Sequence, residues 1–136
     1  MKQNLLSFTL LVLLLLSACS AFPGGDPLAG TSWKLSSYAG KPGLPETDVT
    51  IQFQDGQAGG QAGCNSFGGA YQVNGQRITF HDMASTLMAC TSPAGVMEQE
   101  AEFLGSLNEV ERFELSEGQL QLIRADGQAL IFAPAQ

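Results

Sequence analysis

Apolar and polar residues alternate along most of the chain between residues 33 and 132. Apolar side chains that recur at every second position are typical of strands that bury one face. Seven short runs follow this pattern, at residues 33–35, 49–53, 71–73, 78–80, 113–115, 120–122 and 130–132. The chain is therefore expected to be mostly β.

Dipeptides that favour tight turns separate several of these runs. Glycine accepts a positive φ without steric cost, so these pairs favour hairpins between antiparallel neighbours. They are Asp55-Gly56, Asn74-Gly75, Glu117-Gly118 and Asp126-Gly127. Short strands linked in this way hide their edges by closing into a barrel or by packing as a sandwich. We expect a compact, barrel-like antiparallel sheet of seven to nine short strands.

One segment, after Ser92-Pro93, departs from the two-residue period. Its apolar residues recur at helical spacing, which predicts one amphipathic helix with Ser92 as its cap and Pro93 in its first turn. These residues are Val96, Met97, Phe103, Leu104, Leu107 and Val110. We expect the helix to cover the mouth or side of the sheet, which makes the fold α+β; a partner-binding face is the alternative.

Three glutamates, Glu98, Glu100 and Glu102, fall toward the start of this helix. The helix dipole favours anions there. Glu98 and Glu102 share a helix face and repel one another. We interpret the three residues as a solvated surface rather than as an acid–base pair.

Glycine is concentrated between residues 56 and 71. A phosphate-binding loop would need a following Gly-Lys-Ser or Gly-Lys-Thr and a helix start, but the stretch contains no lysine and its flanks resemble strands. Glycine inside strands marks bulges, tight bends and close backbone approach. We therefore interpret the stretch as structural.

The N-terminus resembles a lipoprotein signal. Lys2 precedes an apolar run at residues 5–16, which is shorter than the roughly 20 residues of a membrane-spanning helix. The run ends in Leu-Ser-Ala-Cys at residues 16–19, the pattern that bacterial lipoprotein processing recognises. We expect a signal peptide at residues 1–18, an acylated Cys19 with a flexible tether at 19–27, and one domain at 28–136. An ordinary secretory signal is the alternative.

Acylation of Cys19 would tether the protein to a membrane, because two or more acyl chains anchor stably. Ser20, rather than aspartate, follows this cysteine. In a Gram-negative cell this second residue favours export to the outer membrane. We expect an outer-membrane lipoprotein that faces the periplasm.

The chain is acidic, with 13 Asp and Glu against 6 Lys and Arg and a formal net charge of −7. Removal of Lys2 with the signal peptide would make this charge −8. Such a body is repelled by nucleic acid and by anionic lipid, so a charge-steered partner would be basic. The alternative is that the charge serves solubility alone.

Cys64 and Cys90 are the only cysteines after Cys19. Outside the cytoplasm disulfides form and persist, and such a bridge would stabilise the fold by roughly 3 to 4 kcal/mol. The alternative is a redox pair, but the two lack Cys-x-x-Cys spacing and a basic neighbour that would lower a thiol pKa. We expect a structural disulfide.

Residues for catalysis are sparse. His81 is the only histidine, which disfavours a zinc site. Asp82, Ser85 and Ser92 lie nearby in the sequence, but nothing resembles a nucleophile elbow around them. We expect no enzyme, no metal site and no cofactor.

Four short motifs carry a family resemblance. They are Leu-Ala-Gly-Thr-Ser-Trp at 28–33, Gly-Cys-Asn-Ser-Phe-Gly-Gly-Ala-Tyr at 63–71, Thr-Leu-Met-Ala-Cys at 86–90 and Met-Glu-Gln-Glu at 97–100. In order and spacing the chain resembles the META domain family, that of the heat-shock protein HslJ, from residue 28 to residue 132. Ser66 stands where many members carry a basic residue.

The resemblance implies a compact, mostly antiparallel barrel-like fold with one helix, found in envelope lipoproteins that are linked to stress and antibiotic tolerance. It implies no enzyme and supplies no catalytic or ligand site. A binding surface, if present, is expected at Asn65, Ser66, Phe67 and Met88, which a Cys64–Cys90 bridge would bring together. The alternative is scaffolding, with Asn65 satisfying backbone groups and Phe67 pointing inward.

The leading functional hypothesis is a non-enzymatic envelope lipoprotein that contributes to stress tolerance by binding or by envelope support. One alternative is an inhibitor of a basic hydrolase such as lysozyme, which suits an acidic tethered domain. Another is a carrier of a small apolar ligand. Large inward positions favour a filled interior over a carrier: Trp33, Phe53, Tyr71, Phe80, Phe113 and Phe132.

Overall fold

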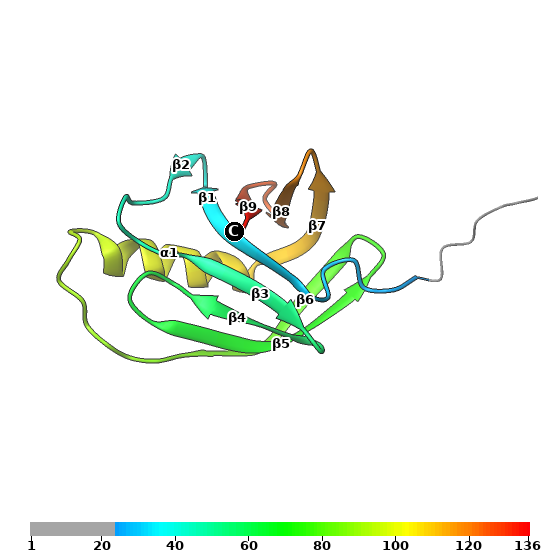
Figure 1. The fold of residues 1–136 in the computed structure, drawn as a ribbon, viewed down its shortest axis with the longest axis horizontal. Coiled ribbons are helices and arrows are strands. Elements are labelled where there is room, and N and C mark those ends of the chain that lie inside the picture. Colours follow the sequence, from blue (N-terminus) through cyan, green and yellow to red (C-terminus); the bar gives the residue numbers. More distant parts are fainter. Residues whose placement is uncertain (1–23) are drawn as a thin grey trace, which may run out of the picture.

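A computed structural model describes residues 24–136 as nine strands and one helix (Figure 1). The elements are β1 (Thr31–Tyr38), β2 (Lys41–Pro42), β3 (Thr50–Gln54), β4 (Gln57–Gln61), β5 (Ser66–Asn74), β6 (Arg77–Ser85), α1 (Val96–Asn108), β7 (Val110–Ser116), β8 (Gln119–Arg124) and β9 (Ala129–Pro134). The expected signal peptide, Cys19 and the first part of the tether lie outside the described residues.

The strands form a closed antiparallel barrel. Their order is β2-β1-β3-β4-β5-β6-β7-β8-β9, and β9 returns to pair with β1. The short β2 is an extra strand, because it pairs with the end of β1 and lies outside the closed ring of eight. The prediction of a mostly β fold with one helix is confirmed, and the sheet closes as a barrel rather than as a sandwich.

The predicted hairpin turns are present. Asp55 and Gly56 have φ of 51° and 75° between β3 and β4, and Glu117 and Gly118 have the same values between β7 and β8. Two consecutive residues with positive φ match the right-handed twist of the flanking strands. These turns set the register of the two hairpins.

Part of the glycine-rich stretch forms a strand, β4, which the apolar pattern does not predict. Its inward apolar residue is the small Ala58, so the strand has no large alternating side chains. A Cβ at Gly60 would lie 2.1 Å from the carbonyl oxygen of Thr50 on β3. The structural interpretation of these glycines is confirmed, because here two strands approach too closely for a side chain.

Helix α1 begins later than the sequence predicts. Ser92 and Pro93 precede it, and its N-cap is Gly95, with φ of 87° and no side-chain cap. The N–H of Gln99 donates to the carbonyl oxygen of Gly95 at 3.0 Å. The chain therefore enters the helix through a left-handed glycine. The prediction also extended the helix to Val110, which belongs to β7.

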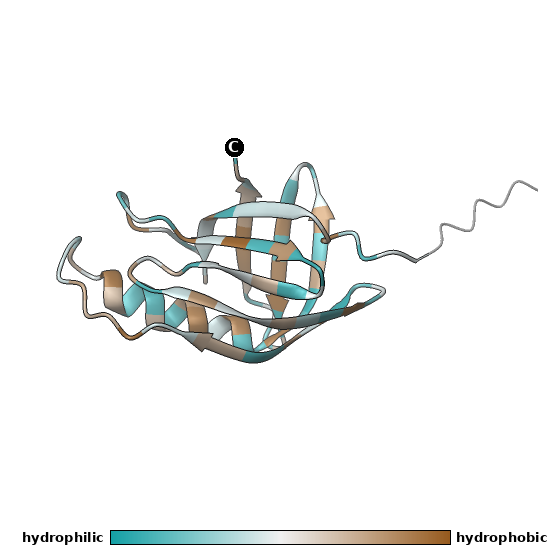
Figure 2. Cartoon of the chain, turned by 60° about the horizontal axis from the view of Figure 1, so that its bottom comes forward, coloured by the Kyte–Doolittle hydropathy of each residue, from teal (hydrophilic) through white to brown (hydrophobic). Residues whose placement is uncertain are grey.

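The helix packs where the barrel wall is weakest. Strands β6 and β7 pair only through Arg77 and Arg112, and α1 is the segment that connects them. Figure 2 shows the helix along one side of the barrel, beside the long β5–β6 ribbon. Phe103 is fully buried between Phe67 and Phe132, at centroid distances of 5.3 and 6.4 Å. The helix thus covers the side of the sheet, as expected.

Aromatic and aliphatic side chains fill the interior of the barrel. Phe53 contacts Tyr71 edge-on, with centroids 4.9 Å apart, and lies 6.4 Å from the half-buried Phe80. Of the expected inward residues, all but Phe80 are buried. Leu115, predicted on a strand with one buried face, is 42% exposed. Within residues 24–136 no helix has the length and hydropathy that a membrane crossing needs.

A clasp joins the start of the domain to the barrel wall. The hydroxyl group of the buried Tyr71 on β5 donates to Asp26 Oδ2, while Asp26 Oδ1 accepts the N–H of Leu28 at 2.8 Å. Burial, the hydrogen bond to Asp26 and the charge of Asp26 together raise the pKa of the Tyr71 hydroxyl well above its usual range. The backbone at residue 26 is thereby held against β5.

This raised pKa predicts an alkaline loss of stability. In the unfolded chain Tyr71 ionises near pH 10, whereas in the folded protein it stays protonated, so the free energy of unfolding should fall as pH rises above about 10. Tyr71→Phe should be less stable at pH 7 by about 1 to 3 kcal/mol and should lose stability less steeply above pH 10. Urea titrations from pH 7 to 11 test this; parallel declines in both proteins would contradict it.

Candidate functional site

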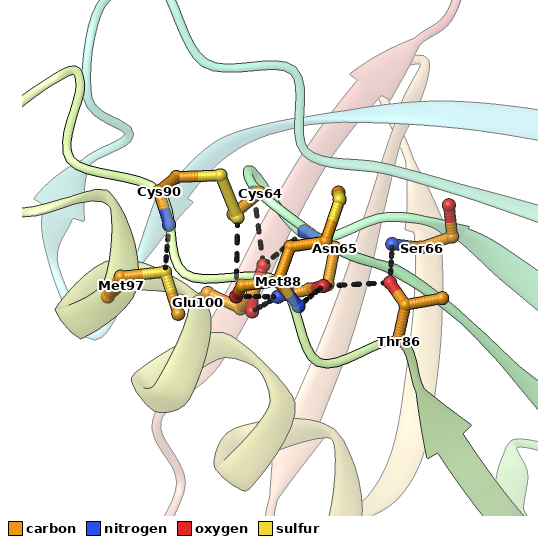
Figure 3. The surroundings of a disulfide bond; sticks show 8 residues. All are labelled: Cys64, Asn65, Ser66, Thr86, Met88, Cys90, Met97 and Glu100. Atoms are coloured by element: carbon orange, nitrogen blue, oxygen red, sulfur yellow. Dashed lines mark hydrogen bonds between the residues drawn. A yellow bond between two sulfur atoms is a disulfide. The ribbon is translucent and has the colours of Figure 1, made fainter.

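The two cysteines of the barrel are joined in a disulfide. Cys64 and Cys90 have Cα atoms 5.9 Å apart and are separated by 26 positions in the sequence. The bond links the turn before β5 to the loop between β6 and α1 (Figure 3). The predicted pairing is therefore present, and the motifs at 63–71 and 86–90 meet around it.

A buried carboxylate lies beside the disulfide. Glu100 on α1 is 4% exposed. Its Oε2 accepts the N–H groups of Cys64 at 3.0 Å and Asn65 at 2.6 Å, and its Oε1 accepts Nδ2 of Asn65 at 2.6 Å. The prediction of a solvated surface is wrong for Glu100, although Glu98 and Glu102 are exposed.

The position of Glu100 on the helix explains this error. Val96, Glu100, Phe103 and Leu107 follow one another at helical spacing and are all buried. The glutamate therefore belongs to the apolar stripe of α1 and not to its solvated face. Its place in that stripe was the sequence signal that would have identified it.

Asn65 links the carboxylate to the loop after β6. Its side chain is 2% exposed, and its Nδ2 also donates to the carbonyl oxygen of Met88 at 3.0 Å. Its Oδ1 accepts the N–H of Met88 at 2.7 Å and the hydroxyl group of Thr86 at 2.8 Å. The side-chain amide has thus used both donors and both acceptor positions.

Asn65 and Glu100, with the backbone of Cys64 and Met88, form what we call the staple. A buried charge is costly unless it receives hydrogen bonds, and here three N–H donors from the Cys64–Asn65 turn supply them. Figure 3 shows these bonds converging on Glu100 and Asn65 beneath the disulfide. The staple holds the turn before β5 against the loop after β6. The polar groups that do this have their hydrogen-bond partners inside the protein.

The structure divides the expected binding surface in two. Asn65 and Phe67 are buried, at 2% and 6% exposure, so the prediction that they form a surface is wrong. Ser66 is exposed, and Met88 is 57% exposed. Next to Met88 lies Leu87, 95% exposed, which the sequence interpretation did not single out. The exposed part of the motif is apolar and lies on the loop after β6.

A second buried amide, Gln99, holds another loop. Its Oε1 accepts the N–H of Leu44 at 2.6 Å, and its Nε2 donates to the hydroxyl group of Thr47 at 3.0 Å. The loop between β2 and β3 is fastened to α1 in this way. Neighbouring residues of one helix, Gln99 and Glu100, therefore anchor two separate loops.

The residues considered for a catalytic triad are exposed. His81, Asp82, Ser85 and Ser92 lie on β6 and on the following loop, and the structure gives no hydrogen bond between their side chains in residues 24–136. In the same part of the chain no group of three or more His, Cys, Asp or Glu side chains is arranged to hold a metal ion.

These features define a class: a closed antiparallel barrel with one covering helix, in which a disulfide and a buried glutamate pin the loop between β6 and the helix. The chain belongs to the META domain family, whose model matches residues 26–136. Membership supports a non-catalytic, envelope-type domain.

Solved structures share the fold. An NMR structure of a protein from Burkholderia xenovorans is 26% identical, with a TM-score of 0.67 over 83% of this chain and 92% of its own. A second NMR structure is 27% identical, with a TM-score of 0.64 over 79% and 91%. A DUF4847 family protein from Bacteroides vulgatus, 18% identical with a TM-score of 0.54 over 79% and 94%, shares the fold alone. No curated protein matches the sequence.

The staple predicts that substitution of Glu100 destabilises the protein more than substitution of Glu98 on the same helix. Glu100→Gln should lower the free energy of unfolding by about 1 to 3 kcal/mol, because a glutamine places an NH₂ group against one of the three donors. Glu98→Gln, on the exposed face of the same helix, should change it by less than about 0.5 kcal/mol. Urea denaturation with the disulfide intact measures both; equal effects would contradict the staple.

Proposed function

We propose that the protein is a lipid-anchored, non-enzymatic envelope protein that contributes to stress or antibiotic tolerance by contact with a partner or with the envelope. The observation that carries this proposal is the staple. Its polar groups are satisfied inside the protein, and what it presents to solvent is a fixed apolar loop at Leu87 and Met88. Such a loop is suited to contact.

The proposed anchor rests on the N-terminal residues. Leu-Ser-Ala-Cys at 16–19 precedes a short tether, and the first strand of the barrel, β1, begins at Thr31. The disulfide between Cys64 and Cys90 agrees with folding in an oxidising compartment. Ser20 favours the outer membrane, with the domain in the periplasm.

The acidic surface favours a basic partner. Four basic residues are each in an ion pair with a carboxylate: Lys34, Lys41, Arg112 and Arg124. Because acidic residues outnumber basic ones by 13 to 6, the domain keeps an excess of negative charge. Positive partners are steered toward such a surface. This supports the second candidate, an inhibitor of a basic hydrolase such as lysozyme. The filled barrel interior gives less support to a carrier of an apolar ligand.

A complementation experiment tests the proposal. In a deletion strain of the bacterium that encodes it, the wild-type protein should incorporate an alkyne-labelled palmitate and restore survival under an envelope-targeting antibiotic. Cys19→Ser should do neither, because it lacks the thiol that accepts the lipid. Ser20→Ala, which keeps that thiol, serves as the matched control and should behave as wild type. Full labelling of Cys19→Ser, or equal survival with it, would contradict the proposal.

A further inference from the structure

The loop after β6 exposes two apolar side chains to solvent, and hydrogen bonds hold its backbone in place. Leu87 is 95% exposed and Met88 57% exposed. Hydrogen bonds fix the backbone on either side of Leu87. The N–H of Thr86 donates to the carbonyl oxygen of Ser66 at 3.0 Å, and the backbone N–H and carbonyl oxygen of Met88 are both hydrogen-bonded to the side-chain amide of Asn65. A fixed exposed leucine is available for contact without an ordering cost at the backbone.

This loop is also free of charge in an acidic protein. No Asp, Glu, Lys or Arg occurs from Met83 to Met97, although the chain contains 19 such residues outside this segment. The acidic body is repelled by an anionic lipid surface, and the repulsion falls with distance from the charges. The 83–97 segment is therefore a part of the domain that approaches lipid at low electrostatic cost.

The tether is long enough to bring this loop to the membrane that would hold Cys19. Asp26 is fastened to Tyr71, which pairs with Phe80 across β5 and β6. Further along the same ladder Phe67 pairs with Ser85, so Leu87 lies roughly 20 Å from Asp26 at the usual rise of a strand. The chain from Cys19 to Asp26, fully extended, spans about 25 Å.

We propose that Leu87 and Met88 insert into the interface of the lipid bilayer that holds the acylated Cys19. The inference rests on the proposed lipid anchor and adds an orientation to it. The end of β6 faces the bilayer, while the β7–β8 hairpin, which Figure 1 shows on the opposite side of the barrel, faces away. The anchor keeps the loop close to the bilayer, at a high local concentration. Burial of one leucine then favours the inserted over the free orientation roughly ten-fold, which is sufficient to orient the domain.

Tryptophan quenching by brominated lipid tests this orientation. The mature acylated protein, residues 19–136, is reconstituted in phosphatidylethanolamine–phosphatidylglycerol vesicles with or without brominated phospholipid. Leu87→Trp and Leu115→Trp replace two exposed residues, the second of them on β7. The native Trp33 is 8% exposed and supplies the same background in each variant. The brominated lipid should roughly halve the added emission of Leu87→Trp and leave that of Leu115→Trp unchanged.

Other outcomes would overturn the proposal in distinguishable ways. Unquenched emission from Leu87→Trp, or equal quenching at both positions, overturns the docking while the anchor stands. Flotation of the vesicles on a density gradient measures membrane binding by the lipid anchor separately. Protein that does not float with the vesicles overturns both the anchor and the docking. Protection of Leu87→Trp from a soluble quencher in whole envelopes, but not in vesicles, overturns lipid docking in favour of a protein partner.

Discussion

The structure depends on one buried carboxylate. Glu100 is removed from water among apolar residues of helix α1, and it is tolerated there because three N–H groups of the Cys64–Asn65 turn point at it. The dependence runs in both directions, since these N–H groups are buried and need an acceptor. Helix, turn and loop are therefore positioned by the same few atoms, and the disulfide makes the arrangement covalent.

Three of the four family motifs, which lie in separate parts of the chain, meet in this arrangement. Residues 63–71 supply the turn and Asn65, residues 86–90 supply the backbone that Asn65 binds, and residues 97–100 supply Gln99 and Glu100. Their polar atoms form hydrogen bonds with one another inside the protein. The functional proposals accordingly rest on the exposed Leu87 and Met88, which the staple holds in place, and on the net negative charge of the chain.

Periodicity alone predicts most of the barrel, because its strands alternate large apolar and polar side chains and its hairpins use turn dipeptides. It misses β2 and β4, where Lys-Pro and a glycine-rich run carry no alternating signal. Within the site, the disulfide follows from the cysteine count and from the export that the N-terminal pattern predicts. The apolar stripe of α1 indicates that Glu100 is buried, but its partners do not follow from the sequence, because only three-dimensional packing shows which N–H donors it meets.

Amide hydrogen exchange at Met88 tests the central claim most directly. The staple predicts that this N–H, bonded to Asn65 Oδ1 at 2.7 Å, exchanges as slowly as amides of the neighbouring strands, whereas the N–H of Leu87, which has no hydrogen-bond partner in residues 24–136, exchanges fast. In Asn65→Ala the protection of Met88 should be lost while strand amides far from the staple keep theirs. Equal and rapid exchange at both positions in the native protein would contradict the account.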